Sequence, residues 1–179
     1  QNVTRSDVGI SIPNGRILNL CLNGFTVSGN IVTGLFSVKN GGTLRICDCS
    51  DTGKVHSGDG FGCVGVYNQG CFILESGTVE GTAVGVYNGD NNYTCTINGG
   101  AVTGKDGIYN QSAGSNAKTF INGGTVTGTN YGVSNNNSST ELYLSGAATI
   151  SGIKADIYTD DSTSYICADN GAETPTPYS

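Results

Sequence analysis

Short runs of alternating apolar and polar residues recur along the chain. They include CFILES at 71–76, CTING at 95–99, TFING at 119–123 and ELYLSG at 141–146. Alternation at period two is typical of β-strands that bury one face. A TVxG-like phrase follows each run, and in most units a GVYN-like phrase follows a few residues later. We therefore expect three short strands in every repeating unit.

The spacing of these phrases is regular. The GVYN-like phrases place an apolar residue at intervals of 20, 22, 25 and 24 residues, at Val66, Val86, Ile108, Val133 and Ile157. A propeller blade needs about 40–45 residues, and leucine-rich or ankyrin repeats need a helical part that Gly- and Asn-rich units do not supply. We therefore predict an all-β fold, a single-stranded parallel β-helix (β-solenoid) of about seven coils with three short strands each. Connections between parallel strands of one sheet are almost always right-handed, so we predict that the chain winds in a right-handed sense.

Stacking in register places equivalent residues about 4.8 Å apart in columns. The first inward ladder holds the five GVYN-phrase residues named above. The second is expected at Val27, Val55, Val79, Val102, Val126 and Ile150, and the third at Leu22, Ile46, Leu74, Ile97, Ile121 and Leu144. Asn68, Asn88, Asn110 and Asn135 end their strands, where stacked amides can hydrogen-bond along the column. Gly81, Gly104, Gly128 and Gly152 are expected where the chain turns.

The pattern also divides the chain. We expect one β-helix domain over 1–170, with an N-terminal cap at 1–15, irregular first coils with a long loop at 16–64, and regular coils at 65–170. Residues 171–179, GAETPTPYS, resemble the start of a Thr/Pro linker to a neighbouring domain. Seven coils would form a rod roughly 30–35 Å long.

Composition limits the function. The formal net charge is −6 and only 8 residues are Lys or Arg, which argues against nucleic acid as a partner. No apolar run approaches the ~20 residues that span a bilayer, so we expect no membrane insertion by this segment. Seven cysteines in a Gly-rich chain with 12% charged residues favour an oxidising, extracellular location.

The cysteines allow two interpretations. Cys47-x-Cys49 with Cys63 and Cys71 could bind zinc, but no second C-x-x-C and no suitably placed His accompany them. Disulfides that close the long loop or link neighbouring coils are favoured, with candidates at Cys21, Cys47, Cys49, Cys63 and Cys71 and a possible Cys21–Cys47 pair. Cys95 is expected at an inward position equivalent to Phe72. We expect no metal and no cofactor.

One outward column is a candidate binding face. Tyr67, Tyr87, Tyr109 and Tyr158 each follow an inward aliphatic residue and therefore face solvent. Such a column could stack against sugar rings, or it could simply stabilise neighbouring strands. Ser134 interrupts it.

Two other outward patterns suggest different functions. Asp48, Asp51, Asp59 and His56 cluster around the long loop, with Asp160 and Asp161 near the end, as in enzymes that cleave polysaccharides. These acids do not repeat at one height, however, and solvated loop charges are the favoured interpretation. Thr-x-Thr-like rows at 26–28, 125–127 and 149–151 are similar to ice-binding faces, but other residues interrupt them.

The order of phrases LNLCLNGFTVSGN (18–30), GGTLRICDCSDTGKVHSG (41–58) and the GVYN…GGTVTG repeats resembles the β-helical repeat regions of secreted or wall-anchored surface proteins of Gram-positive, often gut, bacteria. The resemblance covers about residues 16–167. It implies an adhesin-like or stalk module at the bacterial cell surface. It implies no catalytic residues.

Our leading hypothesis is therefore a non-catalytic extracellular surface module. It would be either an adhesin-like module that binds a host glycan or protein, or a rigid stalk or spacer between other domains. The alternative is a carbohydrate-active β-helix enzyme of the polysaccharide lyase or hydrolase type. Ice binding is a remote third possibility.

Overall fold

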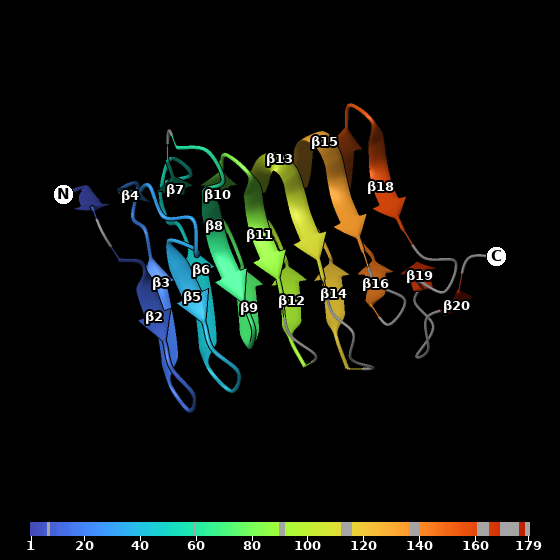
Figure 1. Ribbon diagram of the computed structural model, residues 1–179, viewed down its shortest axis with the longest axis horizontal. Coiled ribbons are helices and arrows are strands. Elements are labelled where there is room, and N and C mark those ends of the chain that lie inside the picture. Colours follow the sequence, from blue (N-terminus) through green and yellow to red (C-terminus); the bar gives the residue numbers. More distant parts are fainter. Residues whose placement is uncertain are drawn as a thin grey trace.

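The computed structural model describes residues 1–6, 8–58, 60–89, 92–111, 116–136, 140–160, 165–168 and 176–177. These residues form a β-solenoid of parallel strands, with no helix among them. The strands stack side by side along one axis from the N-terminal to the C-terminal end (Figure 1). The predicted all-β parallel β-helix is confirmed.

Three columns of strands run along the axis, and each turn contributes one strand to each column. Column 1 contains β1 (Val3–Arg5), β4 (Thr26–Gly29), β7 (Lys54–Ser57), β10 (Thr78–Gly81), the first part of β13 (Ala101–Asn110), the first part of β15 (Thr125–Asn135) and β17 (Thr149–Gly152). Column 2 contains β2 (Ile10–Ile12), β5 (Phe36–Val38), β8 (Val64–Asn68), β11 (Val84–Asn88), the second parts of β13 and β15, and β18 (Ala155–Thr159). Because β13 and β15 cross from one column to the other, the two columns form one sheet.

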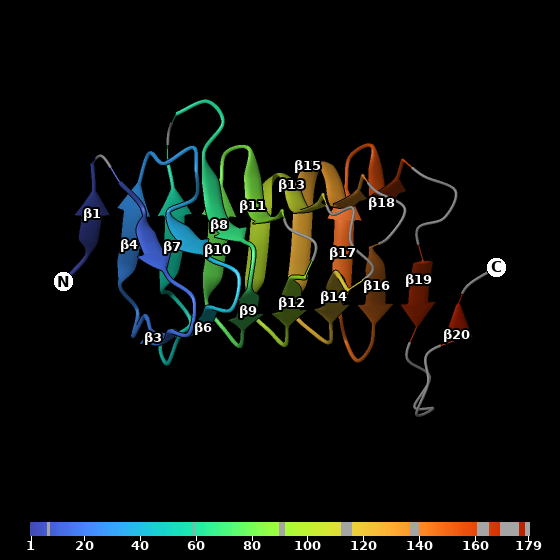
Figure 2. The same ribbon diagram turned by 60° about the horizontal axis from the view of Figure 1, so that its bottom comes forward.

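Column 3 forms the second sheet. It contains β3 (Ile17–Cys21), β6 (Thr43–Cys47), β9 (Cys71–Leu74), β12 (Thr94–Ile97), β14 (Lys118–Ile121), β16 (Glu141–Leu144) and β19 (Tyr165–Ala168). The short β20 (Thr176–Pro177) pairs antiparallel with β19. Figure 2 shows this sheet beside the strands of columns 1 and 2.

The chain makes about six turns, a minor difference from the seven predicted. β1 and β17 hold equivalent places in column 1 and lie six steps apart. In Figure 1 the near strands β8 and β11 run downward while β10 runs upward behind them as the chain advances to the right, which is the predicted right-handed winding. The segment expected to form the N-terminal cap contributes β1 and β2, which start columns 1 and 2.

The inward ladders fill the core. Val66 pairs with Val86, Val86 with Ile108, and so on to Ile157, as predicted. The ladder from Val27 to Ile150 is equally in register. Most of these side chains are fully buried. Burial contributes roughly 1.5–3 kcal/mol for each large apolar side chain, so successive turns stabilise one another.

One member of the third ladder was predicted wrongly. Leu20, not Leu22, is the residue that pairs with Ile46. Leu22 is buried as well, but it lies just beyond β3, where its backbone N–H donates to the carbonyl oxygen of Cys47 at 2.8 Å. The rest of the ladder, from Ile46 to Leu144, has the predicted register.

An asparagine ladder closes column 2, as predicted. Asn68, Asn88, Asn110 and Asn135 are fully buried and in register. Each Nδ2 donates to the Oδ1 of the next Asn, at 2.9, 2.8 and 2.6 Å along the series. The stack ends at Asn135, whose Nδ2 is buried without a partner, because Thr159 occupies the equivalent position on the next turn.

Candidate functional site

The predicted tyrosine column forms a stack of three rings on the outer face of column 2. Tyr67, Tyr87 and Tyr109 are in register, and both neighbouring pairs of ring centroids are 5.1 Å apart. Ser134 takes the fourth position. Tyr158 is therefore separated from the others and stacks on Tyr131, at 4.6 Å between centroids.

This stacking decides which ring faces a ligand can reach. Tyr87 lies between Tyr67 and Tyr109, so both of its faces are covered, and its hydroxyl donates to Oε1 of Gln111. Desolvation and the two neighbouring tyrosines raise the pKa of Tyr87 to about 12. The column therefore presents ring edges along most of its length. Only the end rings, Tyr67 and Tyr109, have a face on which no other ring of this stack lies, and we call that face the free face.

A groove lies beside the free face of Tyr67. The outward residues that precede Tyr67 in column 2 are Ser37 on β5 and Ser11 on β2. Because these side chains are small, the surface is hollowed where further tyrosines would have filled it. The groove has a volume of about 710 Å³. It is lined by Val8, Gly9, Ser11, Val32, Thr33, Gly34, Ser37, Lys39, Gly62, Val64, Tyr67, Ala83, Val84 and Tyr87.

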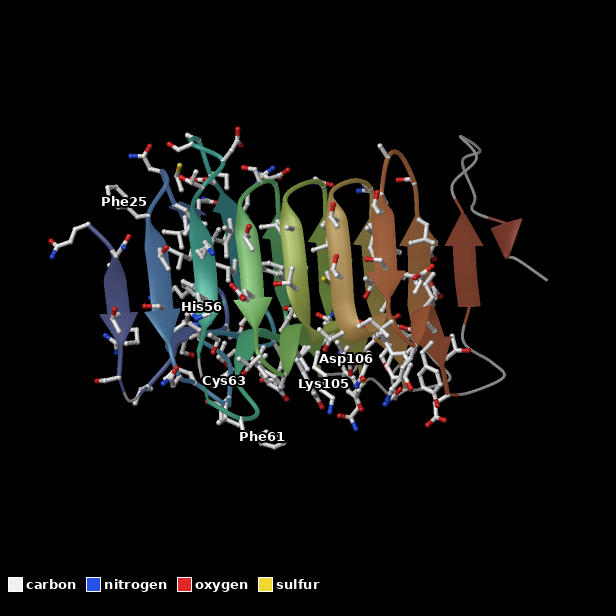
Figure 3. All side chains as sticks on the ribbon, turned by 90° about the horizontal axis from the view of Figure 1, so that it is seen from above. Phe25, His56, Phe61, Cys63, Lys105 and Asp106 are labelled. Atoms are coloured by element: carbon white, nitrogen blue, oxygen red, sulfur yellow. The ribbon has the colours of Figure 1, made fainter. Side chains whose placement is uncertain are left out.

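Loops between columns 1 and 2 form the walls of the groove. Gly34 has a φ of +98° and approaches Tyr67 so closely that an added Cβ would lie 2.7 Å from the Tyr67 Cβ. Val8 and Val32 expose 63% and 60% of their surfaces at the rim. Phe61, in the segment just before Gly62, is fully exposed and projects away from the body of the rod (Figure 3). Exposed apolar residues around a hollow are typical of a binding site.

The groove carries little charge. Lys39 is the one charged residue among its described lining residues, and its Nζ donates to Oε1 of Gln69 at 3.4 Å. Ser11, Ser37 and Thr33 supply hydroxyl groups. An apolar wall with an aromatic face and a few hydroxyl donors is the usual arrangement for a neutral polyhydroxylated ligand, because sugars offer both C–H faces and hydroxyls.

Of the acidic residues singled out by the sequence, the three that the structure describes, Asp48, Asp51 and Asp160, are not among the residues that line this groove. Asp48 is buried and holds its own loop, because Oδ1 accepts from the Gly24 N–H and Oδ2 from the Gly53 N–H, both at 2.7 Å. Asp51 and Asp160 are exposed, whereas Asp59 and Asp161 lie outside the described residues. His56 pairs with Glu80 of the next turn, at 3.0 Å between Nδ1 and Oε2.

The Thr-x-Thr rows are aligned in column 1. Thr26, Lys54, Thr78, Ala101, Thr125 and Thr149 share one line, and Ser28, His56, Glu80, Thr103, Thr127 and Ser151 share the next. The His56–Glu80 pair interrupts the second row with a hydrogen-bonded ionisable couple. The pair divides the row of hydroxyl groups into a short stretch at Thr4 and Ser28 and a second stretch at Thr103, Thr127 and Ser151.

The candidate cysteines separate into two groups. Cys21 and Cys47 are in register, and the Sγ atoms of Cys21 and Cys49 are 3.0 Å apart. Cys63 is buried and Cys71 is half-buried, and Cys95 is buried opposite Phe72, as predicted. Cys21, Cys47, Cys49, Cys63, Cys71 and Cys95 are free thiols, with no pair among them at bonding distance. No group of three or more His, Cys, Asp or Glu among the described residues is arranged to hold a metal ion.

Sequence reasoning found the tyrosine column but missed the groove. The available signal was FSV at 36–38, which is the equivalent of VYN with a small residue in place of tyrosine. The walls come from loops outside the repeat, which no periodic pattern reveals.

Comparisons with protein-family models, with curated proteins and with solved structures found no match. In the part of the chain that the structure describes, no helix is long and apolar enough to cross a membrane.

Proposed function

We propose that this chain is a non-catalytic module of an extracellular surface protein, and that it binds a glycan in the groove beside Tyr67. The observation that carries the proposal is the free ring face of Tyr67 at the end of a stacked tyrosine column, next to the hollow over Ser37 and Ser11. A sugar ring would stack on this face while its hydroxyls bond to Ser11, Ser37 and Lys39.

The described lining favours binding over hydrolysis. Glycoside hydrolysis ordinarily requires two carboxyl groups on either side of the scissile bond. The described lining residues contribute Lys39 but no Asp or Glu. The groove volume lies in the ordinary range for ligand sites, about 300–1,000 Å³.

The rest of the molecule supports a structural role for such a module. Every turn shares its core ladders with the next, so the solenoid behaves as a stiff spacer that holds the groove at a fixed position. The abundance of cysteine, the low charge and the phrase order that resembles Gram-positive surface proteins support a location at the bacterial cell surface. A host glycan is then the natural ligand class.

A glycan array tests the proposal. The purified chain is applied to immobilised neutral and acidic glycans, and each hit is titrated with the free oligosaccharide by calorimetry. Saturable binding that the Tyr67→Ala variant loses supports the proposal. Release of reducing ends or unsaturated products supports the lyase or hydrolase alternative instead. Binding to no glycan, or binding that Tyr67→Ala leaves unchanged, overturns the proposal.

A further inference from the structure

Three cysteines converge at one corner of the rod, away from the groove. Cys21 is the last residue of β3, and Cys47 ends β6 in register with it on the next turn. Cys49 follows two residues later, in the loop before β7. The Cys21 Sγ lies 3.0 Å from the Cys49 Sγ, about 1 Å more than a disulfide bond length of about 2.05 Å.

The position of Cys49 is fixed by groups other than the thiols. The carboxylate of the adjacent Asp48 accepts hydrogen bonds from Gly24 of the first turn and from Gly53 at the end of its own loop. Ser76 Oγ donates to the Asp48 carbonyl oxygen at 2.9 Å from the turn beyond. The loop is therefore anchored on both sides. The approach of Cys49 to Cys21 follows from this network and does not depend on a bond between the sulfur atoms.

The two thiols are also the accessible ones of the three. Cys21 and Cys49 are exposed, whereas Cys47 is only partly exposed. Hydrogen bonding from the Cys49 thiol lowers the pKa of Cys21, and burial raises the pKa of Cys47. Because the thiolate is the reactive form, Cys21 is the better nucleophile.

We propose that Cys21 and Cys49 form a disulfide that ties the first turn to the loop of the second, while Cys47 stays reduced beside it. With a disulfide oxidant such as oxidised glutathione, the Cys21 thiolate attacks one glutathione sulfur, and the oxidant's S–S bond breaks to release one glutathione thiolate. The Cys49 thiolate then attacks the Cys21 sulfur of the mixed disulfide and releases the second glutathione. The protein loses two electrons and two protons, and the oxidant becomes two glutathione molecules.

The test is to map the bond by mass spectrometry. The reduced chain is incubated with oxidised glutathione, quenched with acid, alkylated under denaturing conditions and digested with an endoproteinase that cuts before Asp. Cleavage before Asp48 separates Cys47 from Cys49, and a second digestion with trypsin, which cuts after Arg45, separates Cys21 from Cys47. The expected product joins the Cys21 and Cys49 peptides and is about 2 Da lighter than their sum, with Cys47 alkylated.

Two matched variants give the rate. The Cys47→Ser variant should oxidise at a rate within about twofold of the wild-type rate. The Cys49→Ser variant should oxidise at least about tenfold more slowly, because Cys21 no longer has its near partner. Circular dichroism of both reduced variants checks that they fold. A Cys21–Cys47 bond, equal rates for the two variants, or no oxidation of Cys21 would each overturn the proposal.

Discussion

The side-chain amide of Asn88 donates a 2.8 Å hydrogen bond to Oδ1 of Asn110 one turn further along, and both side chains are fully buried. The Nδ2 of Asn110 in turn donates a 2.6 Å hydrogen bond to Oδ1 of Asn135 on the following turn. Its Oδ1 also accepts from the Thr119 hydroxyl at 3.1 Å. A second, exposed ladder runs through Asn98 and Asn122, with a 2.9 Å bond between them. The chain thus contains the same interaction in two environments.

Replacing Asn110 with Ala should destabilise the fold by about 3 kcal/mol, because it leaves buried donors on Asn88 and Thr119 without an acceptor. The matched variant Asn122→Ala removes an equivalent amide at the surface, where water replaces it, and should cost under about 1 kcal/mol. Urea unfolding of both variants measures the difference. If both variants lost the same free energy of unfolding, burial would not determine how much an asparagine-ladder hydrogen bond contributes to stability.

The glycine of each GVYN phrase should resist substitution. A Cβ on Gly85 would lie 2.6 Å from Val102 Cγ1 and 2.8 Å from the Gly107 carbonyl oxygen on the next turn. Gly85→Ala should therefore lower the free energy of unfolding by about 3 kcal/mol or more, because backbone atoms cannot move aside as a flexible side chain can. Gly60 is the matched control, since its nearest contact would be Cys63 Sγ at 3.3 Å. Gly60→Ala should change the unfolding midpoint little.

Asp48 should make stability depend on pH. Desolvation acts to raise the pKa of this carboxyl, but hydrogen bonds from the backbone N–H groups of Gly24 on the preceding turn and of its own loop outweigh it, so the pKa falls below its ordinary value of 3.8. A lowered folded-state pKa means that the stabilisation is complete above the unfolded-state value and is lost as the pH falls through the folded-state value.

We therefore expect the urea midpoint of the wild-type chain to fall as the pH drops from 5 through the ordinary carboxyl range and on toward the lowered pKa of Asp48. Asp48→Asn should be less stable at pH 6 and should lose less stability over the same range. If the two chains showed parallel pH profiles, another carboxyl group would be responsible.

The groove predicts a contrast between the two ends of the tyrosine stack. Tyr67→Ala should weaken glycan binding by about tenfold, since an aromatic contact contributes about 0.5–1.5 kcal/mol and tenfold corresponds to about 1.4 kcal/mol. Tyr109→Ala removes the ring from the opposite end of the stack, away from the groove, and should change affinity less than about twofold. Calorimetric titration of both variants distinguishes them. Equal losses would show that the whole column, and not its free end, forms the binding face.

Much of the fold followed from the sequence because the repeat is short and regular. Val66, Val86 and Ile108 hold equivalent positions in the sequence repeat, and in the structure they pair in register on successive turns. The error at Leu22 arose where the pattern is weakest, since Leu20 and Leu22 have the same alternation and only the pairing of β3 with β6 distinguishes them.

The sequence by itself determined the parallel stacking, the inward ladders and the buried asparagines. A chain that winds with a fixed period must place the equivalent residues of successive repeats directly above one another. Tertiary structure alone decided which tyrosine face stays open, how the loops wall the hollow over Ser37, and that Cys49 rather than Cys47 has the sulfur nearest to that of Cys21 in the described contacts. Strand spacing is set by backbone hydrogen bonds common to every turn, whereas loop paths and ring stacking depend on side chains that are distant in the sequence.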